Sequence, residues 1–589
     1  MLLNNTVNNR MNFSGIAASP GIGEGTAYIF VNPNLFISER VVSDIPEEIK
    51  RLRSSAMAAV LELSVLKESV RARLGDEFAH IFRSQQTIAE DESIIAEIEE
   101  RIRDNKSSAE ESLCYIFESY ITLFSELDDS DYNKSRVADI EDVYKRILRI
   151  LLGLPDVNLS TLPEKSIIIA RDLLPSDTAM MDIDQITGMV TELGGATSHV
   201  AILANNLGIP AAVGVTGITG AVQNQDRIIL DVSDSEKALV YINPTLEIHQ
   251  KIERTQITLK KHKAQIMKNQ DKPVITRDGQ EITLSANVGS SVELLPARDA
   301  GASSVGLYRS EFLFMNSNSL PSEEEQYQAY RKAAECFEEG FVIIRTLDIG
   351  GDKQLSALPL PVEDNPFLGN RALRLTLSLP ELFLTQLRAI LRAGVHGSVK
   401  IMFPMVGGVP ELDAALELMN QARIDLEREK IPYDRSMEIG IMVEIPSAVW
   451  MADILARQVS FFSVGTNDLT QYLLAADRLN SNVSEYYRVF DPSVFKAVKE
   501  VVRAAKNQGR WVGICGELGG NPLAIPLLVG LGVTELSMSP RAIPEASWLI
   551  REISLKDAEE LANRILELDT DKKIRRVLRE FYKSKEINI

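Results

Sequence analysis

Apolar residues recur at intervals of three and four over residues 44–73, which is the period of one face of an α-helix. These apolar positions are Ile49, Leu52, Ala56, Ala59, Leu63, Leu66 and Val70. Ser43 or Asp44, followed by Pro46, supplies a helix start signal. The helical pattern continues to about residue 152 with little strand character. We therefore expect residues 36–155 to fold as a small helical domain.

From Ser166 onward the pattern changes to short apolar runs of strand length. The runs are Ile167–Ala170, Gly188–Thr191, Ala211–Val213, Arg227–Leu230 and Leu239–Ile242. A charged segment with a helical pattern follows at residues 244–270. We predict an α/β domain over residues 156–243 and a linker helix after it.

Eight further apolar runs follow a predicted hairpin with an Asp278-Gly279 turn, and helical stretches separate them. The runs are Ile282–Val288, Ser304–Tyr308, Val342–Leu347, Val399–Pro404, Ile439–Val443, Phe461–Val464, Val512–Ile514 and Glu535–Met538. Strands that alternate with helices over about 300 residues are typical of a (β/α)₈ barrel. We predict such a TIM-type barrel over residues 271–589.

Polar residues stand where these predicted strands end, and in such barrels the catalytic groups lie at the carboxyl ends of the strands. The residues in question are Arg309, Arg345, Asp348, Glu444, Asn467, Asp468 and Cys515. Glu444 and Asp468 are sufficient to hold Mg²⁺. Arg309 and Arg345 offer planar forks for phosphate and carboxylate oxygens, and Arg478 adds a third. The set predicts a site for a small acid phosphate, with Cys515 as a proton donor or, alternatively, as a buried apolar side chain.

Composition narrows the class of protein. The 589 residues are enough for several domains. The formal net charge of −20 argues against binding to nucleic acid or to anionic membranes, and it fits a basic protein partner. No apolar run approaches the ~20 residues of a membrane span. Three cysteines form neither a disulfide framework nor a metal motif, which favours a reducing cytoplasm. Residues 1–12 are expected to be a disordered extension, with Met1 or Met11 as the start.

Gly194 to His199 places a histidine after two glycines and two hydroxyl residues, immediately before an apolar helical stretch that Gly208 and Pro210 end. A helix N-terminus is a natural anion site. If a hydroxyl such as that of Thr197 fixes one ring nitrogen, the other is free to act as a nucleophile. The segment predicts either a histidine that carries a phosphoryl group or a capping turn that happens to contain a histidine.

Long motifs in this order closely resemble Enzyme I of the bacterial phosphotransferase system, a phosphoenolpyruvate-utilising family. The motifs are GGATSH at 194–199, GLYRSEFLFM at 306–315, IIRTLDIGGDK at 343–353, NPFLGNRALR at 365–374, IMFPM at 401–405, IGIMVEIPSA at 439–448, FFSVGTNDLTQY at 461–472 and GICGELGG at 513–520. The resemblance covers nearly the whole chain from about Phe13. It implies that residues 13–35 join residues 156–243 in a swivelling phosphohistidine domain into which the helical domain is inserted.

The resemblance also implies the chemistry. Phosphoenolpyruvate would phosphorylate His199 at its tele nitrogen, and the phosphoryl group would pass to a histidine of the carrier protein HPr. Mg²⁺ would bind Glu444 and Asp468, and Cys515 would protonate the enolate of pyruvate. The implied phosphoenolpyruvate ligands are Arg309, Arg345, Arg371, Asn467 and Arg478. The barrel would form a homodimer, and HPr would dock on the helical domain, where Glu90, Asp91 and Glu92 form an acidic cluster that otherwise reads as a solvated face.

Two other functions compete with this interpretation. One is an enzyme of the pyruvate phosphate dikinase or phosphoenolpyruvate synthase type, which shares the histidine domain and the barrel but carries a nucleotide-binding domain; the sequence has no Gly-rich nucleotide loop. The other is a non-catalytic regulatory relative. Every catalytic position of the family motifs is intact here, which favours an active enzyme.

Overall fold

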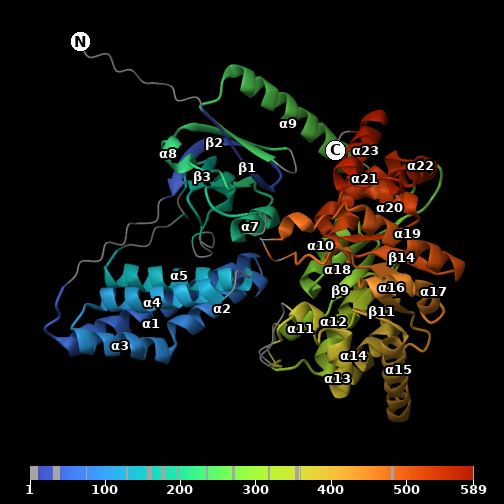
Figure 1. Ribbon diagram of the computed structural model, residues 1–589, viewed down its shortest axis with the longest axis horizontal. Helices are drawn as coiled ribbons and strands as arrows, with labels where there is room; N and C mark the ends of the chain where they lie inside the picture. The colour runs from blue at the N-terminus through green and yellow to red at the C-terminus, as the bar shows by residue number, and fades with distance from the viewer. Residues whose placement is uncertain are drawn as a thin grey trace. The chain divides into compact units, whose positions relative to one another are not determined.

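The computed structural model shows three folded regions (Figure 1). It describes residues 11–30, 40–74, 76–127, 131–154, 159, 162–173, 177, 181–195, 198–233, 237–267, 272–315, 319–351, 357–358, 360–361, 363–478, 480 and 483–587. The chain divides into two compact units, residues 1–261 and 262–589, and each is described by itself below.

The helical region consists of α1 to α5. Their bounds are α1 Ile45–Leu74, α2 Asp76–Ala89, α3 Glu92–Asn105, α4 Ala109–Leu127 and α5 Asp131–Leu151. Asp44 starts α1, because its carboxylate accepts a hydrogen bond from Glu47 N at 3.1 Å. The predicted stripe of α1 is buried from Leu52 to Leu66 and packs against α2 and α5. The side chain of Val70 lies outside the described residues. The helical domain expected from the sequence is therefore confirmed.

The region that contains His199 is a closed barrel whose strands follow one another in the order β1-β5-β4-β3-β2-β6-β7. The bounds are β1 Met11–Ser19, β2 Gly21–Phe30, β3 Ser166–Ala170, β4 Ile186–Thr191, β5 Ala211–Val213, β6 Arg227–Val232 and β7 Lys237–Ile242. β2 pairs in parallel with β3, across the whole helical insertion. The return of the N-terminal segment to this domain is thus confirmed. Closure of the sheet was not predicted, because it depends on strand pairs that the pattern does not specify.

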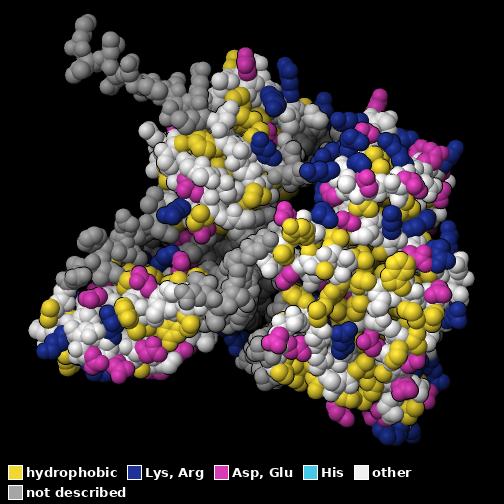
Figure 2. All heavy atoms as spheres, in the orientation of Figure 1, with side chains coloured by type: hydrophobic (Ala, Val, Ile, Leu, Met, Phe, Trp, Pro, Cys, Tyr) yellow, Lys and Arg dark blue, Asp and Glu magenta, His cyan; other side chains and the backbone are white. Residues whose placement is uncertain are grey.

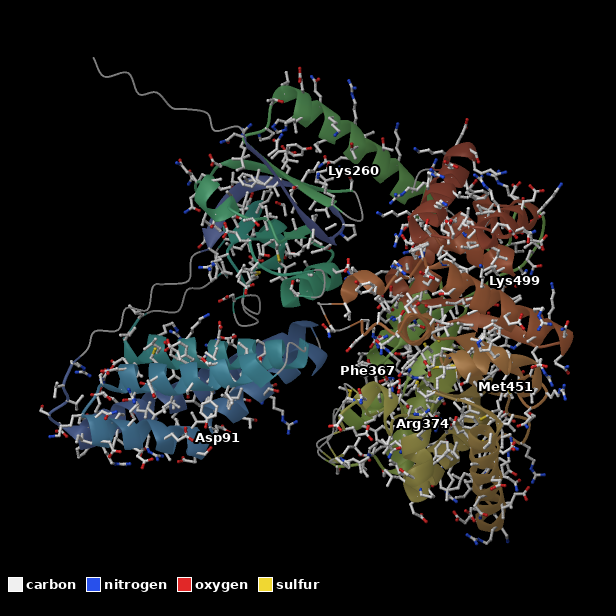
Figure 3. All side chains as sticks on the ribbon, in the orientation of Figure 1. Asp91, Lys260, Phe367, Arg374, Met451 and Lys499 are labelled. Carbon is white, nitrogen blue, oxygen red and sulfur yellow. The ribbon has the colours of Figure 1, made fainter. Side chains whose placement is uncertain are left out.

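Two expected boundaries need correction. Met11 and Asn12 already belong to β1, where they pair with Ile242 and Tyr241 of β7, so the extension predicted over residues 1–12 includes two residues of a strand. Residues 1–10 lie outside the described residues. The predicted linker is the helix α9, Leu246–Met267, and the division between the compact units falls inside it, after Lys261 (labelled nearby at Lys260 in Figure 3).

The C-terminal unit is the predicted (β/α)₈ barrel. Its strands are β8 Thr283–Val288, β9 Ser304–Arg309, β10 Val342–Arg345, β11 Val399–Phe403, β12 Ile439–Val443, β13 Phe461–Val464, β14 Trp511–Ile514 and β15 Glu535–Met538. All neighbours are parallel, and β15 closes the ring onto β8. Each of the eight runs named from the sequence is a strand. The predicted hairpin before β8 is reduced to a single bridge between Ile275 and Glu281.

Helices surround this barrel (Figure 1). They are α10 Leu294–Asp299, α11 Glu311–Met315, α12 Glu323–Cys336, α13 Leu373–Ser378, α14 Pro380–Ala393, α15 Val409–Glu429, α16 Pro446–Trp450, α17 Ala452–Leu455, α18 Thr466–Leu474, α19 Pro492–Asn507, α20 Ile525–Leu531, α21 Ile543–Glu552, α22 Leu555–Leu566 and α23 Asp571–Ser584. The main core lies between them and the strands. Across the described part of the chain, no helix is both long and apolar enough to cross a membrane.

Inside the barrel, a smaller apolar cluster contains Leu307, Ile343, Met402, Met442 and Phe461. At the amino ends of the strands the rings of Phe461 and Trp511 stack at 4.6 Å between centroids, and Phe341 lies 5.8 Å from Trp511. These rings form an aromatic floor. Lys400, whose Nζ lies 5.3 Å from the centroid of the Phe341 ring, is a charged group beside this floor.

Candidate active site

The carboxyl ends of the barrel strands bring the predicted polar residues together. Arg309 and Arg345 are the last residues of β9 and β10 and pair directly in register. Glu444 and Cys515 are the first residues after β12 and β14, and Asn467 and Asp468 lie in the first turn of α18 after β13. The sequence could place these residues at strand ends, and barrel closure makes them neighbours around one mouth.

Arg345 is held by two carboxylates. Its guanidinium contacts Glu311, and its Nη1 lies 2.9 Å from Oδ2 of Asp348. The three side chains are 6 %, 1 % and 3 % exposed. Burial alone would lower the pKa of Arg345, but the charges of Glu311 and Asp348 raise it instead. The guanidinium of Arg345 is therefore permanently charged and held in a fixed position at the strand end.

Asp348 also holds Arg371, the arginine of the GNRALR motif. Its two oxygens accept from Nη2 of Arg371 at 3.1 and 3.4 Å. Nη1 of Arg371 lies 3.9 Å from Oδ1 of Asp468, which in turn lies 3.5 Å from Nη1 of Arg478. Gly350 allows this arrangement, because it has a φ of +102° and a Cβ there would lie 2.7 Å from Cβ of Arg371. A continuous chain of alternating charges thus runs along the mouth.

Glu444 is fully buried and its charge is not balanced by the groups around it. Its Oε1 accepts from the backbone N of Met405 at 2.6 Å, while Oε2 is buried and accepts no hydrogen bond from a described residue. Burial and the negative charges of Asp468 and Asp348 raise its pKa to about 8. A carboxyl whose ionised form is disfavoured by neighbouring carboxylates is stabilised by a cation between them. Glu444 and Asp468 therefore fit a hard divalent ion, although no group of three or more His, Cys, Asp or Glu side chains forms a ready-made metal site among the described residues.

Cys515 is buried directly below the mouth. Its Sγ lies 3.7 Å from the carbonyl oxygen of Val464, and its carbonyl oxygen accepts from Nδ2 of Asn287 at 3.0 Å. Burial raises the pKa of the thiol to about 12, an effect that the nearby Ser463 hydroxyl partly opposes. At neutral pH the group is therefore a protonated thiol, suited to donating a proton and not to acting as a nucleophile.

The other predicted ligands also lie at the mouth. Arg309 is partly exposed and its guanidinium lies 4.7 Å from the ring centroid of Phe312. Oδ1 of Asn467 accepts from the backbone N of Glu517 at 3.2 Å, so this side chain ties α18 to the loop after Cys515. Arg478 donates its backbone N–H to Oε1 of Gln471 at 3.1 Å.

Two residues with clear roles in this arrangement were not proposed as site residues from the sequence. Glu311, two positions after Arg309, was not singled out, and Asp348 was named only as a polar strand-end residue. The signal for Glu311 is a carboxylate inside the otherwise apolar run EFLFM, which a helix can bury only with a cation beside it.

His199 is the first residue of α7, His199–Leu207, as the sequence predicted. Oγ of Ser198 caps the helix by accepting from Ala201 N at 3.4 Å, and Gly208 ends it with a φ of +70°. Gly194 has a φ of +102° and its Cα hydrogen faces Ser198, since a Cβ would lie 3.1 Å from Oγ. Thr197 and the side chain of His199 lie outside the described residues, so the expected contact between them remains a prediction.

The acidic cluster lies where α2 meets α3, beside Asp91 (labelled in Figure 3). Asp91 caps α3 by accepting from Ser93 N at 2.8 Å, and these contacts with Ser93 lower its pKa. Glu92 lies 3.3 Å from Arg53, and Glu90 is exposed. Figure 2 shows acidic side chains gathered along this edge of the helical region.

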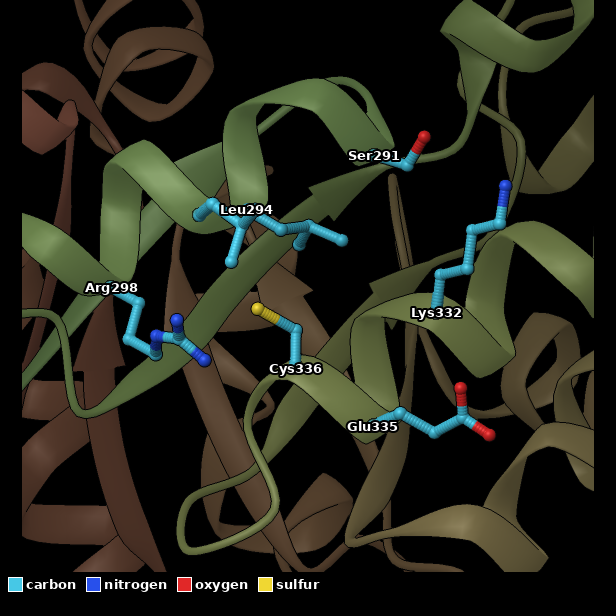
Figure 4. Close-up of a pocket in the computed structure, with 7 residues that line it drawn as sticks. Ser291, Leu294, Arg298, Lys332, Glu335 and Cys336 are labelled. Carbon is cyan, nitrogen blue, oxygen red and sulfur yellow. The ribbon is translucent and has the colours of Figure 1, made fainter.

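A cavity lies elsewhere on the C-terminal unit. It has a volume of about 400 Å³ and lies between α10 and α12, where Leu294, Arg298, Lys332 and Cys336 line it (Figure 4). It is on the outer helical layer, away from the strand ends. We therefore assign the chemistry to the mouth of the barrel.

Comparison with known proteins supports this assignment. The PEP-binding domain of PEP-utilising enzymes matches residues 263–555, their N-terminal domain matches residues 14–136, and their mobile domain matches residues 162–234. A phosphoenolpyruvate-protein phosphotransferase of Staphylococcus carnosus is 40% identical over 97% of this chain and 99% of its own length. The proteins of that name from Haemophilus influenzae and Enterococcus faecalis are 40% and 41% identical and cover 98% and 97% of this chain. With near-complete coverage and every strand-end residue in place, this chain belongs to the phosphoenolpyruvate-utilising enzymes, in the family of the phosphoenolpyruvate-protein phosphotransferases.

Proposed function

We propose that this protein transfers the phosphoryl group of phosphoenolpyruvate to its own His199 and then to a histidine of HPr, releasing pyruvate. This is the first general step of a sugar phosphotransferase system. The observation that carries the proposal is the chain of charges Glu311–Arg345–Asp348–Arg371–Asp468 at the mouth of the barrel. The relatives match over their whole length, which disfavours a dikinase with an additional nucleotide domain.

The charge balance of the mouth fits a multiply charged substrate. Four arginines face four carboxylates there, so the formal charges of the side chains nearly cancel; they are Arg309, Arg345, Arg371 and Arg478, and Glu311, Asp348, Glu444 and Asp468. Fully ionised phosphoenolpyruvate carries about three negative charges. Binding it without a cation would leave that charge uncompensated. A divalent ion bound with the substrate offsets most of it.

Mg²⁺, which the family generally uses, would be held by Glu444 and Asp468. When bound, it supplies Lewis-acid stabilisation of the enolate oxygen and of the phosphoryl oxygens. The arginines orient the phosphate and carboxylate groups, and their fixed positions mean that little reorganisation is needed as charge moves in the transition state. Asn467 holds the loop after β14 and thereby keeps Cys515 beneath the substrate. The Cys515 thiol then donates its proton to the methylene carbon of the enolate.

His199 would accept the phosphoryl group at its tele nitrogen. Its place at the start of α7 supports this role, because free N–H groups and the helix dipole favour negative charge there. A nucleophile on one unit and a substrate site on the other require the two units to approach and separate during turnover. The helix α9 between them is the natural place for that hinge.

The partners follow from charge and exposure. Glu90, Asp91 and Glu92 present an acidic edge that suits the basic face of HPr, although Asp91 also has a structural task as a cap.

Trp450 and Ile454 on α16 and α17, beside Met451, are 75% and 36% exposed. Figure 2 shows apolar side chains gathered over this region. Apolar exposure of this kind supports a homodimer through the barrel. The three unpaired cysteines suit a reducing cytoplasm.

The test is incubation with phosphoenolpyruvate labelled in the phosphoryl group, with Mg²⁺, with and without HPr. The label should appear on the protein in an acid-labile, base-stable form and should leave when HPr is added. His199→Ala should take up no label, and His396→Ala, which loses contacts with Tyr327 and Glu335, should behave as the unchanged protein. Label that survives acid, or that appears on the His199→Ala protein, would exclude this function.

A further inference from the structure

Glu535 is a buried carboxyl in the interior of the C-terminal barrel that the reaction described above does not use. It is the first residue of β15 and is 2% exposed. A Cβ at Gly513 of β14 would lie 2.0 Å from its Oε2, and a Cβ at Gly306 of β9 would lie 2.3 Å from its Oε1. A side chain at either glycine would therefore collide with the carboxyl. The two glycines make the space that this acidic group occupies.

The strand register places this carboxyl close to Cys515. Ser463 pairs with Gly513, and Gly513 pairs with Glu535, so the three stand at one level on adjacent strands. Cys515 follows Gly513 by two residues and therefore points into the interior one level higher, toward the mouth. Because Gly513 has no side chain, nothing from β14 separates Glu535 from Ser463. Ser463 in turn lies near enough to Cys515 to affect the pKa of the thiol.

Polar atoms in this region lack partners. Both oxygens of Glu535, Oγ of Ser285 and Oγ of Ser463 are buried and make no hydrogen bond of ordinary geometry to a described residue. Ser285 nevertheless lies near enough to influence the carboxyl. Buried polar groups are nearly always hydrogen-bonded, and one or two internal waters are their usual partners where protein groups are too far apart. These oxygens form a polar track inside an otherwise apolar cluster.

The track leads toward the mouth and not toward the floor. Below Glu535 the rings of Phe341, Phe461 and Trp511 close the barrel. The charged groups of the interior are Lys400, which pairs with Glu438 at 2.7 Å beside the floor, and Arg345 and Glu444 at the mouth. None of them shifts the pKa of Glu535, which burial raises to about 8. Glu535 is therefore mostly a neutral carboxylic acid at pH 7.

We propose that Glu535 is a positioning residue for proton transfer, which supplies a proton through Ser463 to Cys515 as Cys515 protonates the enolate. This inference rests on the proposed role of Cys515. In the step, the Cys515 S–H bond breaks as the C–H bond of pyruvate forms. The Ser463 hydroxyl, directly or through a bridging water, gives its proton to the sulfur and takes the proton of Glu535. The product is pyruvate with Glu535 ionised, and water restores that proton after product release.

The physical benefit of this proton transfer is that the negative charge does not remain on the sulfur of Cys515. A thiolate left at Cys515 would be buried beside Glu444, and the charges of these two groups repel. Transfer of a proton from a carboxylic acid with a pKa near 8 to a thiolate whose acid has a pKa near 12 is downhill. The charge therefore ends one level deeper in the barrel, away from the substrate.

The experiment measures isotope exchange between phosphoenolpyruvate and labelled pyruvate by the full chain with Mg²⁺, which needs no acceptor protein, over pH 6 to 9.5. With Glu535→Gln we expect an unchanged KM for phosphoenolpyruvate and a maximal exchange rate at pH 7 that is lower by about tenfold or more. The unchanged protein should lose exchange on the alkaline side with a midpoint near pH 8, and this loss should be absent in Glu535→Gln.

Each other outcome has a definite meaning. A Glu535→Gln protein with the unchanged rate, or with a lower rate and the same alkaline loss, would overturn the proposal, since a structural role alone gives the latter. If that variant does not fold, Ser463→Ala decides: a lower rate without the alkaline loss supports the relay, and an unchanged rate, or a lower rate with the same alkaline loss, refutes it. Glu545→Gln on α21 removes another carboxyl whose pKa burial raises and should change nothing. If Cys515→Ala exchanges at the full rate, the assigned role of Cys515 fails instead.

Discussion

Asp348 accepts two hydrogen bonds from one nitrogen of Arg371, at 3.1 and 3.4 Å, and both side chains are 3% exposed. The same carboxylate lies 2.9 Å from Arg345. Arg345 ends β10, whereas Arg371 precedes α13, so Asp348 joins two segments of the chain into one anion-binding surface. Burial makes this link rigid, because an arginine without its partner would be costly there.

Asp348→Asn should weaken both substrate binding and stability. Asparagine keeps the shape but removes the charge that holds two buried guanidinium groups. We expect KM for phosphoenolpyruvate to rise by roughly tenfold, equivalent to about 1.4 kcal/mol, and the free energy of unfolding to fall by about 1–3 kcal/mol. Steady-state kinetics and denaturant unfolding measure the two effects. Asp413→Asn, at an exposed position of α15, is the control, and equal effects in both variants would contradict the assignment.

Removal of Mg²⁺ should stop phosphorylation without unfolding the protein. Glu444 and Asp468 are held in place by Met405 N and by arginines, so we expect the ion to serve the chemistry and not the fold. Glu444→Gln should reproduce the effect of a chelator on labelling while circular dichroism stays unchanged. Full labelling in excess chelator would disprove the metal role.

Cys515→Ala should lower kcat and leave binding nearly intact. The side chain is buried beneath the mouth, so its loss removes a proton donor and only a small buried volume. General acid catalysis typically contributes about 10²–10⁴-fold, and we expect a loss in that range in pyruvate formation. Cys336→Ala, on the outer helical layer, is the matched control. A wild-type kcat for Cys515→Ala would remove the thiol from the mechanism.

The stability of the protein should fall as pH rises toward 9, and Glu535→Gln should reduce that fall. Burial raises the folded-state pKa of Glu535 from its ordinary value of 4.5 to about 8, so its contribution to stability is complete below about pH 4.5 and is lost as pH rises through 8. At 1.36 kcal/mol per unit the effect has an upper bound of about 5 kcal/mol. Calorimetric unfolding at pH 6 and pH 9 compares the two proteins. An identical pH dependence in both would show that this carboxyl is not the titrating group.

A fragment that ends near Lys260 should fold alone, since the N-terminal unit has its own helical and barrel cores. It should exchange phosphate with phosphorylated HPr, because that step needs only His199 and the docking edge. It should not react with phosphoenolpyruvate, whose proposed ligands all lie in the other unit. Phosphate exchange on the purified fragment is the measurement. A folded fragment that takes no phosphate from HPr, or one that phosphoenolpyruvate labels directly, would contradict the assignment of the units.

The local features of the fold could be predicted because they depend on neighbours in the sequence. The stripe of α1, the start of α7 at His199 and the eight strands of the C-terminal barrel all follow from periodicity and from Gly and Pro signals. The polar residues at the strand ends could be predicted for the same reason, because Arg345 and Glu444 lie at or directly after apolar runs that are recognisable as strands. The start of β1 at Met11 was not predicted, because polar Asn12 gives no strand signal in the sequence and this part of β1 is recognisable only from its pairing with β7.

The sequence by itself determined which elements form, in what order, and which residue types stand at their ends, because these depend on periodicity and on local backbone preference. Only the tertiary structure decided which of those residues meet. The chain from Glu311 to Asp468 spans four segments, and the space that the Glu535 carboxyl occupies depends on the absence of a side chain at Gly513. Burial then changes the chemistry of the assembled groups, since it keeps the Cys515 thiol protonated and raises the pKa of Glu444 and Glu535. Such shifts arise from desolvation and from charges distant in sequence, which a linear pattern does not contain.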